Sequence, residues 1–423
     1  MAAMLRSRRA RSPLAAAVLG VLLTSCTLPG TQSAGGRAHG AASNAGAASP
    51  PEITVSPADR ARAVALDSPV VVSSSSGRLD TVTVQELGTA TAATGELSPD
   101  GRRWTLRQAL DPGANYKISA HARGGSGQAA GVETSFSTLI ASGRLLTSFT
   151  PADGSVVGVG EPIDLSFNTP IPADRRAALL ERIKVTSTPG VMGAWHWFSD
   201  TSVHFRTEDY WPAGAHVSVI ANLKGFNAGG GFWGLGSWSM SFSVGDKHVS
   251  IIDDKSHQMQ VFNNDQLINT WPVSMGKAGF KTLEGTLIVL YKTYKVFMDS
   301  CSTFGGAACI PGAPNFYRDY VYYDTAVSSD GYFIHAAPWS VYAQGRYDVS
   351  HGCINLSTAR ATTFYNYSLS GDVVIVKNTG SAATVTDGEG DWQIDFSQFS
   401  NTASLGAVWT GDIASTLPGA RAT

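Results

Sequence analysis

The sequence predicts a mostly β protein with two tandem β-sandwiches, a further β-rich domain and a C-terminal extension. Short stretches that alternate apolar and polar residues are separated by turn clusters such as 98–101 and 111–113, as in half-buried strands joined by tight turns. This pattern begins again about a hundred residues later, which indicates a repeated domain. After Gly245 a third series of strands follows, and within it only residues 357–369 have the pattern of a helix.

The start of the chain has the features of an export signal. Four arginines precede an apolar run over residues 14–23, which is too short for a stable membrane anchor and fits a secretory signal. Residues 1–25 are therefore predicted to be a signal peptide. Residues 23–26 resemble a bacterial lipobox, which implies cleavage before Cys26 and attachment of lipid to that cysteine. An ordinary signal peptide with an incidental cysteine is the alternative.

A tether and two sandwiches are expected to follow the leader. Residues 26–50 are rich in Ala, Gly and Ser, a composition that cannot bury enough apolar area to fold, so we expect a lipidated flexible tether. Immunoglobulin-like (Ig-like) sandwiches are assigned to residues 51–140 and 145–245. The repeat supports them, because residues 112–118 are echoed by residues 213–219.

Two features of the second sandwich receive a structural interpretation. The glycine-rich residues 229–236 lack the Gly-Lys-Ser/Thr of a phosphate loop, so they are predicted to form a turn between strands. His196, His204 and His216 do not have the spacing of metal ligands, and we expect them to be ordinary strand or loop histidines.

Residues 350–356, Ser-His-Gly-Cys-Ile-Asn-Leu, are the most informative stretch of the chain. Cys353 follows a histidine and a glycine, and His335 lies eighteen positions upstream. A cysteine attacks only as its thiolate, so it needs an imidazole to take its proton and N–H donors to stabilise the oxyanion. Cys353 is the predicted nucleophile, His335 its base, and the N–H groups of Gly352 and Cys353 the predicted oxyanion donors. A buried structural thiol beside ordinary polar histidines is the alternative.

The surrounding residues closely resemble the catalytic motif of the L,D-transpeptidase (YkuD) family. That motif pairs a histidine, small residues, Pro and Trp with a Ser-His-Gly-Cys-apolar-Asn block, and residues 334–357 contain every element. The resemblance covers roughly residues 246–400. It implies a YkuD-type catalytic domain over 246–378, with a short helix after the cysteine, and a C-terminal extension over 379–423. The two sandwiches make it similar to the actinobacterial type of this family.

The resemblance also implies a reaction. The cysteine would attack the amide between the diamino acid and D-Ala of a peptidoglycan tetrapeptide stem, release D-Ala and form a thioester. The amine of a second stem would then give a 3→3 cross-link. L,D-carboxypeptidase activity, attachment of proteins to the wall, and a non-catalytic wall-binding lipoprotein are the alternatives. A papain-like peptidase is disfavoured, because His335 precedes Cys353 and the papain signature is absent.

Roles for the neighbouring residues follow from the same resemblance. A backbone carbonyl beside His335, at Ala336, is expected to hold the imidazole in its productive tautomer. His351, placed with the catalytic residues, and Asn355 are expected to shape the turn around Cys353 and its hydrogen bonds, with electrostatic support of the thiolate as a second role for His351. Residues expected to bind substrate are Met298, Tyr317, Phe333, Trp339, Ser350 and Asn355. For the aromatic members, packing in the core or the lid is the alternative.

Cysteine spacing and charge complete the predictions. Cys301 and Cys309 enclose seven residues and are predicted to form a disulfide, with free thiols or a metal site as alternatives. The resemblance implies that this bridge would stiffen a lid over the substrate. No metal or organic cofactor is expected. The net charge of −2 does not suggest nucleic-acid binding. The expected partners are peptidoglycan stems, carbapenem β-lactams as covalent inhibitors, and the cell membrane, where a lipid anchor would hold the exported protein facing the wall.

Overall fold

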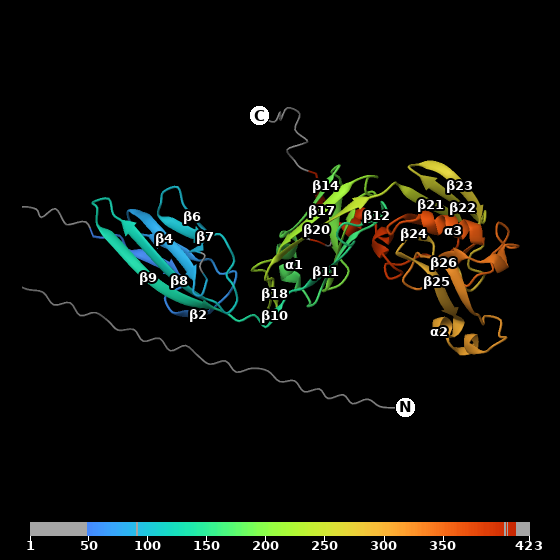
Figure 1. Ribbon diagram of the computed structural model, residues 1–423, viewed down its shortest axis with the longest axis horizontal. Coiled ribbons are helices and arrows are strands. Elements are labelled where there is room, and N and C mark those ends of the chain that lie inside the picture. Colours follow the sequence, from blue (N-terminus) through green and yellow to red (C-terminus); the bar gives the residue numbers. More distant parts are fainter. Residues whose placement is uncertain (1–48, 90–91, 402, 404, 412–423) are drawn as a thin grey trace, which may run out of the picture. The chain divides into compact units, whose positions relative to one another are not determined.

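The structure is a computed structural model in which residues 49–89, 92–401, 403 and 405–411 are described (Figure 1). The predicted signal peptide, Cys26 and nearly all of the predicted tether lie outside these residues. Within the described ranges, no helix is long and apolar enough to cross a membrane.

The first sandwich consists of two antiparallel sheets with one parallel edge pair. Its four-stranded sheet has the order β1 (Ile53–Ser56), β3 (Val71–Ser74), β7 (Arg103–Leu106) and β6 (Gly95–Leu97). Its five-stranded sheet has the order β2 (Ala61–Val64), β9 (Ala129–Thr138), β8 (Asn115–Arg123), β4 (Arg78–Glu86) and β5 (Ala92–Ala93). Strand β8 buries every second residue, which is the expected pattern for a strand with one face on a core.

The second sandwich repeats this plan. One sheet has the order β11 (Thr147–Thr150), β13 (Ile163–Phe167), β16 (Ser202–Thr207), β15 (Met192–Trp197) and β30 (Ala407–Trp409). The other has the order β12 (Val156–Val157), β20 (Ser237–Val244), β17 (His216–Asn222) and β14 (Ile183–Thr188). A small third sheet contains β10 (Gly143–Arg144), β19 (Phe232–Trp233) and β18 (Asn227–Gly229). The predicted glycine-rich turn is confirmed, because it joins β18 to β19.

Helix α1 (Ala173–Leu180) of the second sandwich was absent from the sequence prediction. Pro172 is the N-cap residue, and the first turn contains an acidic residue, Asp174. Its last two residues, Leu179 and Leu180, are buried in the sandwich core. The helix is therefore short but has clear start signals.

The catalytic domain is built on two sheets around its own core. One has the order β23 (Gln266–Pro272), β22 (Gln258–Asn263), β21 (His248–Asp253), β29 (Val373–Lys377) and β24 (Gly285–Ile288). The other has the order β25 (Tyr291–Asp299), β26 (Arg318–Ala326), β27 (Phe333–Ala336) and β28 (Ile354–Leu356). The predicted helix is confirmed as α3 (Thr358–Tyr367), with Ser357 at its N-cap. A short helix α2 (Ser300–Phe304) and a 3-10 turn, η1 (Gly306–Cys309), follow β25 and were not predicted.

The C-terminal extension packs on the second sandwich. It contains η3 (Gly390–Gln393), α4 (Phe396–Phe399) and β30, and β30 pairs antiparallel with β15. The indole N–H of Trp392 donates to the carbonyl of Gly160 at 2.8 Å. The predicted mostly β architecture is observed: two sandwiches are followed by a further β-rich domain, with a short helix after Cys353, and by a C-terminal extension.

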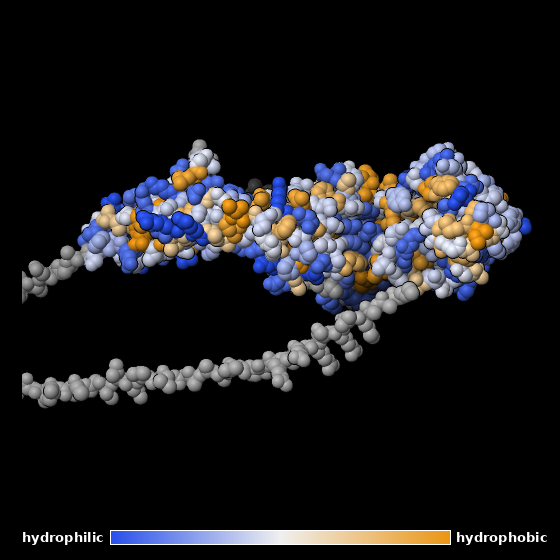
Figure 2. Space-filling view, turned by 90° about the horizontal axis from the view of Figure 1, so that it is seen from below, coloured by the Kyte–Doolittle hydropathy of each residue, from blue (hydrophilic) through white to orange (hydrophobic). Residues whose placement is uncertain are grey.

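Most of the visible surface is hydrophilic, with separate apolar patches (Figure 2). Several exposed apolar side chains belong to the β25–β26 hairpin of the catalytic domain: Tyr291, Tyr294, Phe297, Tyr320 and Tyr322. Their rings pair across the hairpin, with Phe297 and Tyr320 5.0 Å apart and Tyr294 and Tyr322 5.6 Å apart.

Candidate active site

Two adjacent parallel strands bring the predicted nucleophile and base together. In β27 and β28, Ile334 pairs with Ile354 and His335 pairs with Asn355. Cys353 directly precedes β28, so this register places the segment of the nucleophile beside that of His335. Strand pairing thus closes the seventeen residues of chain between them.

The imidazole of His335 is fixed by the main chain. The side chain is buried, and its Nδ1 lies 3.0 Å from the carbonyl oxygen of Ala336. A carbonyl only accepts hydrogen bonds, so Nδ1 carries the hydrogen and Nε2 presents its lone pair. Burial lowers the pKa of His335 to about 4, against a weaker opposite effect of the Ala336 carbonyl. The predicted carbonyl contact is confirmed, and the imidazole is neutral at pH 7.

The thiol of Cys353 is also neutral at rest. Burial raises its pKa to about 11, a hydrogen bond from the Phe333 N–H opposes this, and the charge of Asp324 adds to it. Its Sγ lies 3.8 Å from the carbonyl of Gly331. A neutral thiol has to give up its proton during attack, and this is the step for which His335 is the predicted base.

The turn before the cysteine is held by Ser350. Its hydroxyl donates to the carbonyl of Cys353 at 2.6 Å and accepts from the N–H of Gly352 at 3.1 Å. Gly352 has φ +124°, and a Cβ there would lie 2.6 Å from the ring of Tyr332. Of the two predicted oxyanion donors, the Gly352 N–H is thus already engaged. The Cys353 N–H donates to no group among the described residues.

His351 packs among aromatic side chains. Its ring lies 4.8 Å from that of Phe280 and 5.0 Å from that of Tyr317, and its Nε2 is 3.3 Å from the Asn315 side-chain oxygen. Burial and the charge of Lys277 lower its pKa to about 4. An uncharged imidazole cannot support a thiolate as a cation does, so this part of the prediction is not favoured by the structure.

The predicted disulfide between Cys301 and Cys309 is confirmed. It closes the segment of α2 and η1, and Asp299 caps α2 by accepting from the Cys301 N–H at 2.9 Å. Phe304 of this segment contacts the ring of His351 at 6.1 Å. The disulfide therefore stiffens a segment whose Phe304 contacts His351, two residues before the predicted nucleophile.

The six predicted substrate-binding residues fall into two groups. Trp339 is 52% exposed, and its ring centroid lies 6.1 Å from that of His335. Tyr317 lies near Cys353, and its pKa is raised mainly by burial and to a smaller extent by the proximity of Cys353. Met298 is half-buried on β25. The other three are buried supports of the site: Phe333, Ser350 and Asn355. Their side chains pack or bond within the domain, as when the Asn355 amide donates to Ser340.

Sequence reasoning missed Asp324. Tyr322 pairs with Ala336 and Thr325 with Ile334, so a β-bulge places both Tyr323 and Asp324 opposite His335. Tyr323 has φ +55°, a strained value for an aromatic residue. The Asp324 side chain is fully buried, and neither of its oxygens has a hydrogen-bond partner in the described part of the chain. Burial raises its pKa to about 7. No sequence signal marks a bulge of this kind.

The fold and this site define a thiol-dependent catalytic domain carried on Ig-like sandwiches. Profiles of two families match the chain: the Bacterial Ig domain over residues 61–227 and the L,D-transpeptidase catalytic domain (YkuD) over residues 247–376. L,D-transpeptidase 2 of Mycobacterium tuberculosis is 39% identical over 352 residues, which cover 82% of this chain and 84% of that protein. L,D-transpeptidase 5 of the same species is 31% identical over 363 residues, covering 84% and 77%. The chain belongs to the L,D-transpeptidase family, and it is an enzyme.

Solved structures also match part of the chain. The structure of LdtMt1 in complex with imipenem is 29% identical and covers 56% of this chain and 99% of that one, with a TM-score of 0.46. L,D-transpeptidase 3 of Mycobacterium tuberculosis, in complex with a faropenem-derived adduct, is 31% identical over 56% of this chain and 98% of that one, also with a TM-score of 0.46.

Proposed function

We propose that this enzyme forms 3→3 cross-links in peptidoglycan through a thioester on Cys353. The observation that carries the proposal is the His335 imidazole: its Nδ1 donates to Ala336, so Nε2 presents its lone pair, and its strand pairs with the strand that directly follows Cys353. A residue that only filled the core would not need a fixed tautomer beside a thiol.

In the first half-reaction, Nε2 of His335 takes the thiol proton as Sγ attacks the carbonyl between the diamino acid and D-Ala. The Cys353 N–H donates to the oxyanion that forms. The C–N bond then breaks, the proton passes from His335 to the departing amine of D-Ala, and the thioester remains. A general base of this kind contributes about 10² to 10⁴ in rate.

In the second half-reaction, the side-chain amine of an acceptor stem attacks the thioester and gives its proton to His335. The C–S bond breaks, and the thiolate recovers the proton. Water in place of the amine gives a tripeptide, which is the carboxypeptidase alternative. The exposed Trp339 and the half-buried Tyr317 are proposed to hold the donor stem, with the disulfide-closed segment as a lid.

The same thiol is proposed to open the β-lactam ring of a carbapenem. Attack on the lactam carbonyl breaks its C–N bond, but the nitrogen stays attached to the product, so the acyl group is retained. Export and lipid attachment at Cys26 are proposed from the leader and the tether composition, with the sandwiches raising the catalytic domain above the membrane.

The test is incubation of the protein with a disaccharide tetrapeptide, followed by mass spectrometry. The proposal predicts loss of D-Ala and a cross-linked dimer, both absent with Cys353→Ala. Tripeptide without dimer would support the carboxypeptidase. Unchanged substrate, with a folded protein, would contradict both activities and favour the wall-binding alternative.

A further inference from the structure

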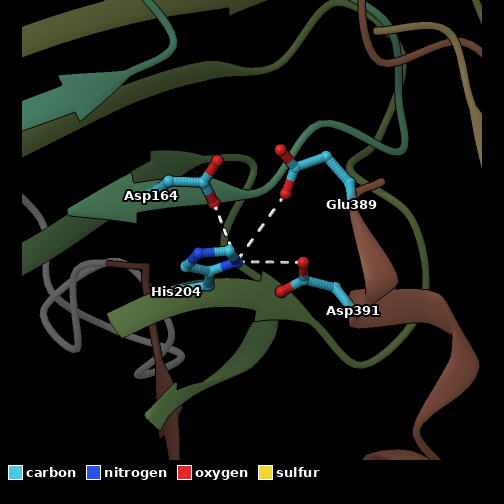
Figure 3. Close-up of side chains that lie close together, drawn as sticks. All are labelled: Asp164, His204, Glu389 and Asp391. Carbon is cyan, nitrogen blue, oxygen red and sulfur yellow. Dashed lines mark hydrogen bonds and ion pairs between the residues drawn. The ribbon is translucent and has the colours of Figure 1, made fainter. Parts of the chain in front are cut away.

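Four side chains from distant parts of the sequence meet at one atom in the second sandwich (Figure 3). The Nδ1 of His204, on β16, lies 3.0 Å from Asp391 Oδ2, 3.1 Å from Asp164 Oδ1 and 3.7 Å from Glu389 Oε2. Asp164 belongs to β13, whereas Glu389 and Asp391 belong to the start of η3 in the C-terminal extension. The four ligand atoms all lie within 4.8 Å of one another.

One hydrogen on Nδ1 cannot satisfy three carboxylates. Asp391 Oδ2 is the acceptor with hydrogen-bond geometry. Asp164 Oδ1 and Glu389 Oε2 point at the same nitrogen and are shielded from solvent. Apart from a hydrogen bond between the two carboxyl groups, which needs a shared proton, they have no hydrogen-bond partner among the described residues. The Asp391 side chain is fully buried, and its second oxygen also lacks a partner in that set. Buried carboxylates without partners are costly, so this arrangement calls for a further positive group.

The nearest arginine does not supply that group. Arg206 donates from Nη2 to the carbonyl of Ile394 at 2.6 Å and from Nη1 to that of Thr207 at 3.2 Å. Its guanidinium also stacks on Trp392 at 4.6 Å and Phe399 at 4.7 Å. The charge of Asp391 acts on Arg206, but no ion pair joins them within the described residues.

The geometry fits a metal ion. Four ligands at Zn–N and Zn–O distances of about 2.0–2.2 Å in a tetrahedron lie about 3.3–3.5 Å apart. The three distances from Nδ1, 3.0, 3.1 and 3.7 Å, surround that value. The Nε2 of His204 lies 3.1 Å from the Ser202 hydroxyl. If Nε2–H donates there, the lone pair of Nδ1 is free for a metal, as in the usual second shell of a metal-bound histidine.

We propose that Asp164, His204, Glu389 and Asp391 bind a divalent first-row transition metal, with Zn²⁺ as the best fit. One imidazole with three carboxylates suits such an ion better than Mg²⁺ or Ca²⁺, which prefer oxygen ligands alone. Four protein ligands leave no open position, so the site is structural.

The ion would fasten the C-terminal extension to the second sandwich. Two ligands come from neighbouring strands β13 and β16, and two from the extension that follows the catalytic domain. Directly after Asp391, Trp392 bonds to Gly160 of the sandwich and the amide of Gln393 donates to Thr286 of the catalytic domain. Metal binding therefore stabilises the segment that contacts both parts.

The experiment measures metal content and melting temperature, neither of which depends on turnover. Full-length protein carrying Cys353→Ala, so that the thiol cannot hold zinc, is loaded with Zn²⁺, freed of unbound metal and analysed by plasma mass spectrometry. His204→Gln and Glu389→Gln are compared with His216→Gln, a control on β17 whose ring bonds to Ser243. Each protein is then melted with and without EDTA, and with Zn²⁺, Mn²⁺ or Ca²⁺ restored.

The proposal predicts about one zinc per chain in the Cys353→Ala protein and in the His216→Gln control. EDTA should lower their melting temperature by about 5 °C or more, and Zn²⁺ should restore it. His204→Gln and Glu389→Gln should retain no zinc and should not respond to EDTA. Glu389 is 29% exposed, so its variant decides the matter if His204→Gln does not fold.

Two outcomes would overturn the proposal. One is a Cys353→Ala protein that retains no metal and melts at one temperature with EDTA or with any of the three ions, because the cluster would then be held by shared protons. The other is zinc retention unchanged by both Glu389→Gln and His204→Gln. A response to Ca²⁺ alone would contradict the assigned class of metal.

Discussion

His335 and His204 are both largely buried histidines, but their surroundings give them opposite properties. His335 bonds to one backbone carbonyl, and burial lowers its pKa to about 4. Burial also acts to lower the pKa of His204, but the hydrogen bond to Asp391 and the charges of Asp164 and Glu389 raise it to about 9. An uncharged hydrogen-bond acceptor therefore leaves a buried histidine neutral, with a lone pair on Nε2. Neighbouring carboxylates instead favour a cationic or metal-bound histidine.

The largest difference between the two histidines should appear when each imidazole is removed in turn. His335→Gln should lower kcat by about 10² to 10⁴, because the base that accepts the thiol proton is lost. His204→Gln should leave kcat of a folded, metal-supplied sample close to that of the unchanged protein, since His204 lies in the second sandwich. Cross-linking assays on disaccharide tetrapeptide measure both. An equal loss in the two variants would remove the functional distinction between the sites.

A second variant tests the turn beside the His335 site. Gly352→Ala would place a Cβ 2.6 Å from the Tyr332 ring at φ +124°. Strain of this kind costs about 1–3 kcal/mol and should shift the Cys353 N–H away from the oxyanion, lowering kcat more than it raises KM. Steady-state kinetics and thermal melting measure the two effects. Gly380, with φ +76° and nothing within 4 Å of its Cβ, offers a control for strain without a clash. Normal kinetics for Gly352→Ala would contradict the proposed fit.

The smallest effect concerns Asp324, a buried carboxyl in the β-bulge opposite His335. Its pKa rises from 3.8 to about 7 because it is buried. Between about pH 4 and 7 the folded protein therefore holds a proton that the unfolded chain has lost, and stability falls as pH rises through this window. The loss is on the order of 2 kcal/mol after allowing for relaxation and water access. Asp324→Asn should remove it.

The measurement is the difference in melting temperature between pH 5 and pH 8. It should be a few degrees smaller in Asp324→Asn than in the unchanged protein, because an amide does not titrate. Asp324→Ala is the control for the unpartnered amide. Equal differences in all three proteins would show that Asp324 does not titrate in this range.

The parts of the site that lie close together in sequence were predictable. Cys353 and His335 were found because their motif is compact, and Cys301 and Cys309 because a short loop joins them. The surroundings of His351 were not predictable in the same way, because its ring contacts Phe280 and Tyr317, which come from other parts of the sequence.

The remaining features depend on tertiary structure. Asp164, His204, Glu389 and Asp391 come from three separated segments, so no spacing reveals them. The bulge that buries Asp324 follows from the register of β26 and β27 and has no composition of its own. Helix α1 could have been predicted, because Pro172 and Asp174 are helix-start signals in the sequence. It was missed because the sequence on both sides of it has the pattern of strands.

In the resting enzyme, the His335 site holds a neutral thiol and a neutral imidazole. The most direct measurement is the rate of alkylation of Cys353 by iodoacetamide as a function of pH, with the labelled cysteine identified by peptide mapping. A thiol pKa of about 11 predicts a rate that keeps rising tenfold per pH unit through pH 9. A plateau below pH 7 would reveal a preformed thiolate and imidazolium pair, and would contradict the account.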